Sequence, residues 1–135
     1  ISADAIAVAE QNARQLDLDN LRFVEGSWIE PVRDLRYPVV VSNPPYVAED
    51  DQALAALKRE PASALVAPEE GLGCIRVLAD TVPDVLAEGG IFLFEHGADQ
   101  AAAIDALLTD AGWTDIETFN DLAGLPRVTR ARRKA

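Results

Sequence analysis

The sequence predicts an α/β fold, in which helices cover a mainly parallel sheet that closes with an antiparallel strand pair. Two short runs, 38–42 and 91–94, are apolar without polar alternation, which is typical of strands covered on both faces. A helical apolar stripe over 101–111 follows the second run and ends at a glycine. Two strand-like segments then follow each other across a polar turn, 113–119 and 127–132. They predict the antiparallel pair.

The N-terminal part is expected to begin with a helix. Ser2 can cap this helix, and Asp4 lies in the first turn, where a negative charge is favourable. Apolar residues at helical spacing continue to about residue 16. Residues 21–25 are the first strand candidate, and 38–42 are the next.

A covering loop is expected between 48 and 68, with one short helix at about 52–58. This segment mixes acids, alanines and two prolines, as lids often do. The next segment, 69–88, has a wide apolar stripe at helical spacing. It predicts a helix that Pro83 bends or interrupts and that the glycine pair at 89–90 ends.

Composition limits the classes of partner. The chain has 135 residues, which fits one domain, and a formal net charge of −11. Five of the 12 basic residues stand in the last nine positions, so the rest is strongly acidic and should repel DNA. Cys74 is the only cysteine, which excludes an internal disulfide and fits the cytoplasm. No apolar run approaches the roughly 18 residues that span a bilayer, and we expect no membrane span.

The most informative feature is the turn Asn43-Pro44-Pro45-Tyr46, which directly follows the strand over 38–42. Each proline pushes the preceding residue toward extended geometry, and neither proline has an N–H to donate. The turn is therefore stiff and rich in acceptors. Asn43 adds a carboxamide, and Tyr46 adds a flat ring with a polar tip. Because ligands bind beyond the carboxyl ends of parallel strands, the turn fits a planar substrate that carries an NH2 group.

Several motifs together resemble the class I S-adenosylmethionine-dependent methyltransferases, and within them the protein-(glutamine-N5) methyltransferases of peptide-chain release factors. The resemblance runs through nearly the whole chain. The proline turn alone also resembles adenine-N6 DNA methyltransferases and several rRNA methyltransferases, so the combination carries the resemblance. Its motifs are Val41-Ser42-Asn43-Pro44-Pro45-Tyr46-Val47, Arg59-Glu60-Pro61 with Ala64-Leu65, Gly89-Gly90 with Phe94-Glu95-His96-Gly97, and Asp121-Leu122-Ala123-Gly124 with Arg127-Val128.

The resemblance implies substrate contacts at the turn. The Asn43 side chain would accept one N–H of a glutamine amide, the carbonyl of Pro44 would accept the other, and Tyr46 would pack against the amide plane. Pro45 would complete the substrate-binding turn. The implied substrate is the Gly-Gly-Gln loop of a bacterial release factor.

The resemblance also implies cofactor contacts. Trp28 matches the position that lies along the adenine of S-adenosylmethionine, and Asn43 would face the cofactor end of the pocket. Ser27 departs from the pattern, because many relatives carry an acid there, and a hydroxyl would bind the adenine amino group more weakly.

A Rossmann-like sheet with the strand order 3-2-1-4-5-7-6 is implied as well. Its first two strands and the glycine-rich cofactor loop would lie upstream of Ile1. Residues 1–135 are therefore expected to be a single partial catalytic domain and a monomer. We expect these residues alone to bind the cofactor poorly and to fold marginally, with unpaired strand edges in the middle of the sheet.

Other interpretations stay open at this point. Base methylation of nucleic acid is the alternative within enzymes, and a noncatalytic partner-binding fragment is the alternative of another class. His96 is read as a structural histidine rather than a proton acceptor. Glu95 could face the cofactor's sulfonium or bind backbone N–H groups, and Arg59 with Glu60 could fix the lid to the sheet. No spacing of His, Cys, Asp or Glu predicts a metal site.

Overall fold

The computed structural model describes residues 2–55 and 61–133. They form two compact units, Ile1–Asp34 and Leu35–Ala135, and each is described by itself. Among the described residues, no helix is both long and apolar enough to cross a membrane.

The first unit contains helix α1, Ala3–Gln15. Ser2 is its N-cap, and the Ser2 hydroxyl accepts a hydrogen bond of 3.2 Å from the amide of Ala5. Both the helix and its cap were predicted and are confirmed. Ala13 is the buried position of the helix.

The strand predicted over 21–25 is wrong. These residues form no strand, and Leu21 and Val24 are exposed. A strand is stabilised by hydrogen bonds to a neighbouring strand, and no described segment pairs with this one. The unit instead continues into a 3₁₀ helix, Glu30–Val32, with Pro31 in its first turn.

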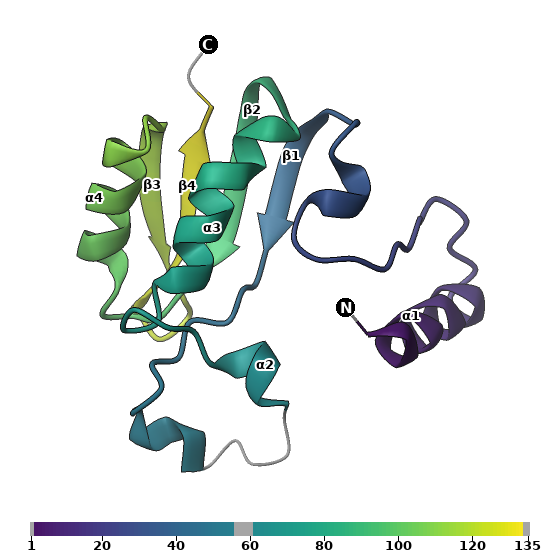
Figure 1. Cartoon of the computed structure of the whole chain (residues 1–135), viewed down its shortest axis with the longest axis horizontal. Coiled ribbons are helices and arrows are strands. Elements are labelled where there is room, and N and C mark those ends of the chain that lie inside the picture. The colour runs from purple at the N-terminus through teal and green to yellow at the C-terminus, as the bar shows by residue number, and fades with distance from the viewer. Residues whose placement is uncertain (1, 56–60, 134–135) are drawn as a thin grey trace. The chain divides into compact units, whose positions relative to one another are not determined.

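The second unit is built on a four-stranded sheet, which Figure 1 shows with its covering helices. Its order is β1-β2-β4-β3, with β1 and β2 parallel and β4 antiparallel to both of its neighbours. The α/β class and the closing antiparallel pair are confirmed, and the order agrees with the 4-5-7-6 part of the expected sheet. The strands are β1 Tyr37–Ser42, β2 Leu86–Glu95, β3 Thr114–Asn120 and β4 Pro126–Arg132.

Two helices, α3 Gly73–Thr81 and α4 Ala101–Asp110, pack on one face of this sheet (Figure 1). The core lies between these helices and the sheet. It contains Phe92 and Phe94, whose rings stack with centroids 4.8 Å apart, and Trp113, whose ring centroid lies 5.5 Å from that of Phe92. Burial of aromatic side chains contributes most to the stability of such a core.

Strand β1 differs from its prediction in burial. A strand covered on both faces was expected, yet Val41 is 74% exposed and Val39 is 46% exposed. The reason is that β1 is the edge strand of the described sheet, paired with β2 on one side only. The expectation of an unpaired strand edge is thus met within the described residues.

The boundary between α3 and β2 also differs from its prediction. The helix ends at Thr81 and a 3₁₀ helix, Val82–Asp84, follows around Pro83, as the missing N–H of proline favours. The glycine pair at 89–90 does not end a helix but lies inside β2. A register shift between β1 and β2 at this point accommodates the pair.

The segment after β1 is irregular, as predicted for a covering loop. The helix expected over 52–58 is a 3₁₀ helix at Gln52–Ala55, and 56–58 lie outside the described residues. A short helix that was not predicted, α2 Ala62–Leu65, follows. An isolated parallel bridge then joins Val47 to Val66.

Candidate active site

The proline turn leaves the carboxyl end of β1 and opens on a cavity. Pro44 is buried and fixes the turn, whereas Asn43 is exposed. The cavity has a volume of about 280 Å³. It is lined by Asn43, Pro44, Pro45, Tyr46, Val47, Ala64 and Leu65. The predicted substrate-binding residues are therefore brought together around one hollow, with the α2 region forming its other wall.

Asn43 also borders a second cavity, of about 290 Å³, across the ends of β1 and β2. Leu93, Phe94 and Glu95 line this second cavity together with Val128. Within residues 2–55 and 61–133, the Asn43 side chain makes no hydrogen bond. Its carboxamide can thus both accept and donate toward a ligand.

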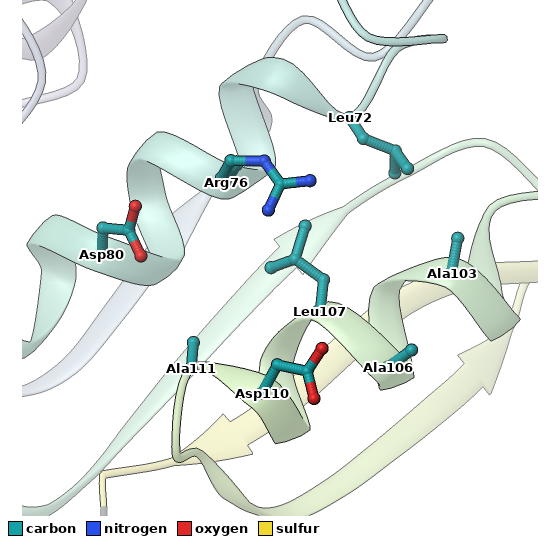
Figure 2. Close-up of a pocket in the computed structure, with 8 residues that line it drawn as sticks. All are labelled: Leu72, Arg76, Asp80, Ala103, Ala106, Leu107, Asp110 and Ala111. Atoms are coloured by element: carbon teal, nitrogen blue, oxygen red, sulfur yellow. The ribbon is translucent and has the colours of Figure 1, made fainter.

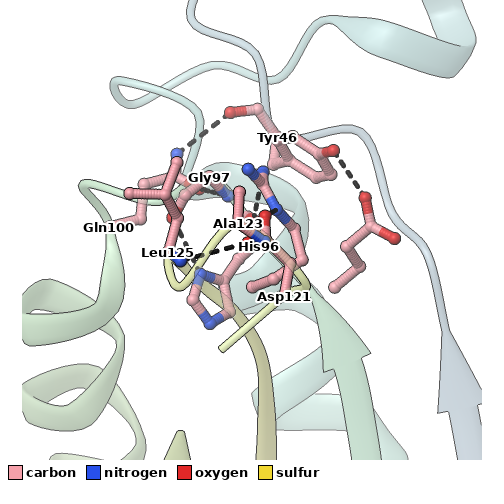
Figure 3. A network of polar contacts seen from close by, with 9 residues as sticks. Tyr46, His96, Gly97, Gln100, Asp121, Ala123 and Leu125 are labelled. Carbon is pink, nitrogen blue, oxygen red and sulfur yellow. Dashed lines mark hydrogen bonds and ion pairs between the residues drawn. The ribbon is translucent and has the colours of Figure 1, made fainter. Parts of the chain in front are cut away.

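Tyr46 is oriented by a charged partner. The Tyr46 hydroxyl donates a hydrogen bond of 2.6 Å to Oε1 of Glu95, at the end of β2 (Figure 3). Burial raises the pKa of the Tyr46 phenol, and the hydrogen bond and negative charge of Glu95 raise it further. The phenol therefore stays protonated and donates. The sequence suggested the cofactor's sulfonium or backbone N–H groups as partners of Glu95, and it did not suggest Tyr46.

Arg127 and Asp121 form an ion pair in the hairpin between β3 and β4. Nε of Arg127 lies 3.4 Å from Oδ2 of Asp121, and the Arg127 guanidinium donates to the carbonyl of His96 at 3.1 Å. The other carboxylate oxygen of Asp121 accepts from the amides of Leu125 and Ala123. These backbone donors, with the help of Arg127, lower the pKa of Asp121. The carboxylate thus orders the hairpin loop beside the site.

The surroundings of His96 are compatible with the structural role that the sequence suggested. His96 is 0% exposed. Its Nδ1 lies 2.8 Å from the carbonyl oxygen of Gly97, and its Nε2 lies 2.9 Å from the hydroxyl of Thr129. A carbonyl can only accept, so Nδ1 carries the proton and Nε2 accepts from Thr129. Burial lowers the pKa of His96, so it favours the neutral ring.

The predicted cofactor contacts Trp28 and Ser27 lie in the first unit. The Trp28 side chain is 46% exposed, with a backbone φ of +49°, and Ser27 is half-buried. The roles of Trp28 and Ser27 as cofactor contacts beside Asn43 stay predictions, because Asn43 belongs to the other unit. Arg59 and Glu60 lie outside the described residues. Among the residues described, no cluster of three or more His, Cys, Asp or Glu could hold a metal ion.

A cavity larger than the two at the turn lies between α3 and α4, with a volume of about 490 Å³ (Figure 2). Its charged residues are Arg76, Asp80 and Asp110. Arg76 already forms an ion pair of 2.9 Å with Glu69. The groove contains none of the turn residues, so size alone does not identify the active site.

Sequence reasoning missed Gln100, which contacts the turn from the N-terminus of α4. A lone glutamine before a helix gives no chemical signal of its own. The one available hint was its position shortly after Glu95-His96-Gly97, at the sheet edge that also carries the turn.

Comparison with known proteins decides the family. The sequence profile of the methyltransferase small domain matches residues 1–71, which is more than half of the 135 residues. The chain belongs to the methyltransferase small domain family. The turn at the end of β1 is therefore part of a methyltransferase domain.

Curated relatives are similar over almost the whole of this methyltransferase domain. The release factor glutamine methyltransferase of Vibrio cholerae serotype O1 is 42% identical over 134 residues, which are 97% of this chain and 47% of the relative. The protein of the same name from Neisseria gonorrhoeae is 43% identical, over 96% of this chain and 48% of the relative. The chain thus spans about half the length of the curated relatives it matches.

Solved structures share the fold of this methyltransferase domain. A methyltransferase from Pyrococcus furiosus superposes with a TM-score of 0.73 at 14% identity, over 100% of this chain and 60% of the other. A candidate methyltransferase solved in complex with SAH has a TM-score of 0.54 at 13% identity, over 96% and 36%. At these identities, the likeness concerns the Rossmann-like fold.

Proposed function

We propose that the complete protein transfers a methyl group from S-adenosylmethionine to the side-chain amide nitrogen of a glutamine in a peptide-chain release factor. The observation that carries the proposal is the exposed Asn43 carboxamide, which lines a cavity beside Pro44 at the end of β1. The names of the curated relatives support the substrate class. A translation factor as substrate would place the enzyme in the cytoplasm.

The turn supplies the hydrogen-bond acceptors that a primary amide needs. Oδ1 of Asn43 would accept one N–H of the glutamine side chain, and the carbonyl of Pro44 would accept the other. The two prolines have no N–H to compete, and they stiffen the backbone that carries the acceptors. Because the Asn43 side chain makes no hydrogen bond among the described residues, no hydrogen bond to those residues has to break first.

This geometry addresses the poor nucleophilicity of an amide. The nitrogen lone pair is delocalised into the carbonyl group, so the nitrogen reacts only when it is held in a reactive orientation. Fixing both N–H groups directs the nitrogen along one line of approach, and positioning of this kind can contribute several kcal/mol, roughly 7 in favourable cases. The Tyr46 ring, oriented through Glu95, would limit rotation of the amide plane. The released proton would pass to water or a nearby acceptor.

The residues present are compatible with S-adenosylmethionine. When bound, the cofactor supplies an activated methyl group on a sulfonium. Trp28 offers a half-exposed indole face, as stacking on a planar adenine requires, and Ser27 offers a hydroxyl. The Asn43 side chain borders the cavity that ends at Glu95, where a carboxylate would favour a positive charge nearby. The roles of these residues follow from the proposal.

Nucleic-acid base methylation is the second enzymatic candidate. The net charge of −11 disfavours binding to a phosphate backbone. A noncatalytic binding module is the candidate of the other class. An exposed carboxamide that lines a cavity favours catalysis over this module, since partner binding alone would not require two directed acceptors.

The test is methyl transfer by the complete protein. Radiolabelled cofactor is incubated with a release factor, with the same factor carrying Ala in place of the glutamine of its Gly-Gly-Gln loop, with rRNA and with DNA. We expect label in the unmodified release factor alone. Label in nucleic acid would replace the proposal with base methylation, and label in no substrate would favour the binding module.

A further inference from the structure

Gln100 contacts three separate segments through one side chain. It is only 9% exposed. Its Nε2 donates to the carbonyl of Tyr46 at 3.0 Å, and its Oε1 accepts from the amide of Gly97 at 2.8 Å (Figure 3). The same Nε2 also donates to the carbonyl of Glu70 at 3.3 Å. Both amide hydrogens are used, so the orientation of the carboxamide is determined.

The carbonyl of Tyr46 is crowded from a second side by Gly71. Gly71 has a φ of +86°, and a Cβ at this position would overlap both the Tyr46 carbonyl oxygen and Nε2 of Gln100. The close approach therefore requires glycine. It fixes the Tyr46 carbonyl between Gly71 and Gln100.

Tyr46 is thus held at both ends, by the last residue of β2 and by the segment that follows this strand. Its hydroxyl binds Glu95, and its carbonyl binds Gln100, five residues further along. The next residue, Val47, pairs through its own amide with the carbonyl of Leu65 in the α2 region. The turn that carries the acceptors is consequently fixed to the sheet on one side and to the covering segment on the other.

We infer that Gln100 is a positioning residue for methyl transfer, which acts through the Tyr46 carbonyl to hold the Pro44 carbonyl and Asn43 in their reactive arrangement. The inference rests on the proposed function. Gln100 lines neither cavity at the turn and so has no direct contact with a substrate there. A displacement of about 1 Å in an acceptor can cost on the order of 10²-fold in rate. A hydrogen bond that holds the Tyr46 carbonyl can therefore affect the rate without touching the substrate.

The decisive variant is Gln100→Glu in the complete protein, because it keeps the shape and removes the donors. At pH 8 the ionised carboxylate would face the carbonyls of Tyr46 and Glu70, and we expect kcat/KM for the release factor to fall roughly 10- to 100-fold. Burial raises the pKa of such a carboxyl. A protonated carboxyl regains one donor, so kcat/KM relative to wild type should recover as the pH is lowered to 6.

Two further variants define what this recovery means. Gln100→Met removes the donors without adding a titratable group, and its kcat/KM relative to wild type should be low and independent of pH. Gln11→Glu makes the same chemical change on the exposed face of α1 and should equal wild type. The ionisable neighbours, His96, Glu95 with Tyr46, and Arg127 with Asp121, are present in all variants, so the ratio to wild type removes their titration.

Amide hydrogen exchange gives a readout that needs no activity. In Gln100→Glu at pH 8, exchange of the amides of 46–48 should accelerate, while the amides of α1 keep their wild-type rates. If the wild type methylates no release factor, the proposed function fails. Hydrogen exchange would still show whether Gln100 holds the segment 46–48 in place. Wild-type exchange at 46–48, wild-type kcat/KM, or a Gln100→Glu defect that stays constant from pH 8 to 6 would each overturn the inference.

Discussion

Tyr46 and Glu95 join the ends of the two parallel strands through one short hydrogen bond, 2.6 Å from the phenol oxygen to Oε1. The two residues are 49 positions apart in the sequence. The bond gives the aromatic ring of the turn a fixed partner on the sheet, and the acceptor is a carboxylate, which strengthens it. The orientation of the ring therefore depends on Glu95 as much as on the prolines before it.

Replacing Tyr46 by Phe should lower kcat/KM for the release factor about tenfold. The ring stays, but it loses a hydrogen bond to a charged group, which contributes roughly 1.5 kcal/mol. Steady-state methyl transfer by the complete protein measures this effect. Tyr37→Phe is the matched control, since the Tyr37 hydroxyl makes no hydrogen bond among the described residues. Equal rates for Tyr46→Phe and wild type would show that the hydrogen bond from Tyr46 to Glu95 does not contribute to catalysis.

Asn43→Ala should reduce turnover by about 10²-fold or more, because one of the two directed acceptors is lost. Its side chain is exposed, so the midpoint of thermal unfolding should move by no more than about 2 °C. Asn12→Ala, on the exposed face of α1, should leave both quantities unchanged. An Asn43→Ala enzyme with wild-type turnover would contradict the mechanism.

The elements with strong periodicity were predictable from the sequence. Helices α1 and α4 and the hairpin β3–β4 agree with their predictions to within about one or two residues. In each case the apolar spacing and the end signals, such as the Ser2 cap, indicate the same element. The segment 21–25 failed because its apolar pattern was local, whereas a strand depends on a partner.

The internal contacts of the site could not be predicted in the same way. The turn itself was visible, since proline and asparagine determine local geometry. The partners of Tyr46, namely Glu95 and Gln100, lie 49 and 54 positions away. Only the parallel pairing of β1 with β2 brings them to the same edge, and the register of that pairing contains a shift at the glycine pair that no sequence pattern indicates.

His96 predicts a pH dependence of stability. Its pKa is lowered by burial, so the folded protein favours the neutral ring, and the unfolded chain binds the proton more readily. The contribution of His96 is therefore fully present above its ordinary pKa of about 6.5 and is lost as the pH falls below that value. Protonation would also place a hydrogen on Nε2, which now accepts from Thr129.

Thermal unfolding of the complete protein between pH 8 and pH 5 measures this effect. Wild type should lose more stability over that range than His96→Asn, which has no titrating ring at this position. The two proteins are compared by the slope of stability against pH, because the substitution also removes buried hydrogen bonds and lowers stability at every pH. Parallel slopes for the two proteins would show that the proton on His96 has no part in the loss.

A substitution at Trp113 should lower the stability of the protein without changing its catalytic rate. The Trp113 indole Nε1 donates a buried hydrogen bond of 3.0 Å to the carbonyl of Ala79 near the end of α3, and its ring packs on Phe92. Trp113→Phe keeps an aromatic ring but leaves that carbonyl without its donor, which should cost about 1–3 kcal/mol in the free energy of unfolding. Val77→Ala, at an exposed position of the same helix, should stay within about 0.5 kcal/mol of wild type. Since Trp113 lines neither cavity at the turn, Trp113→Phe should retain wild-type kcat/KM at 25 °C. Denaturant unfolding and methyl transfer, measured on the same sample, would contradict this separation if activity fell in proportion to stability.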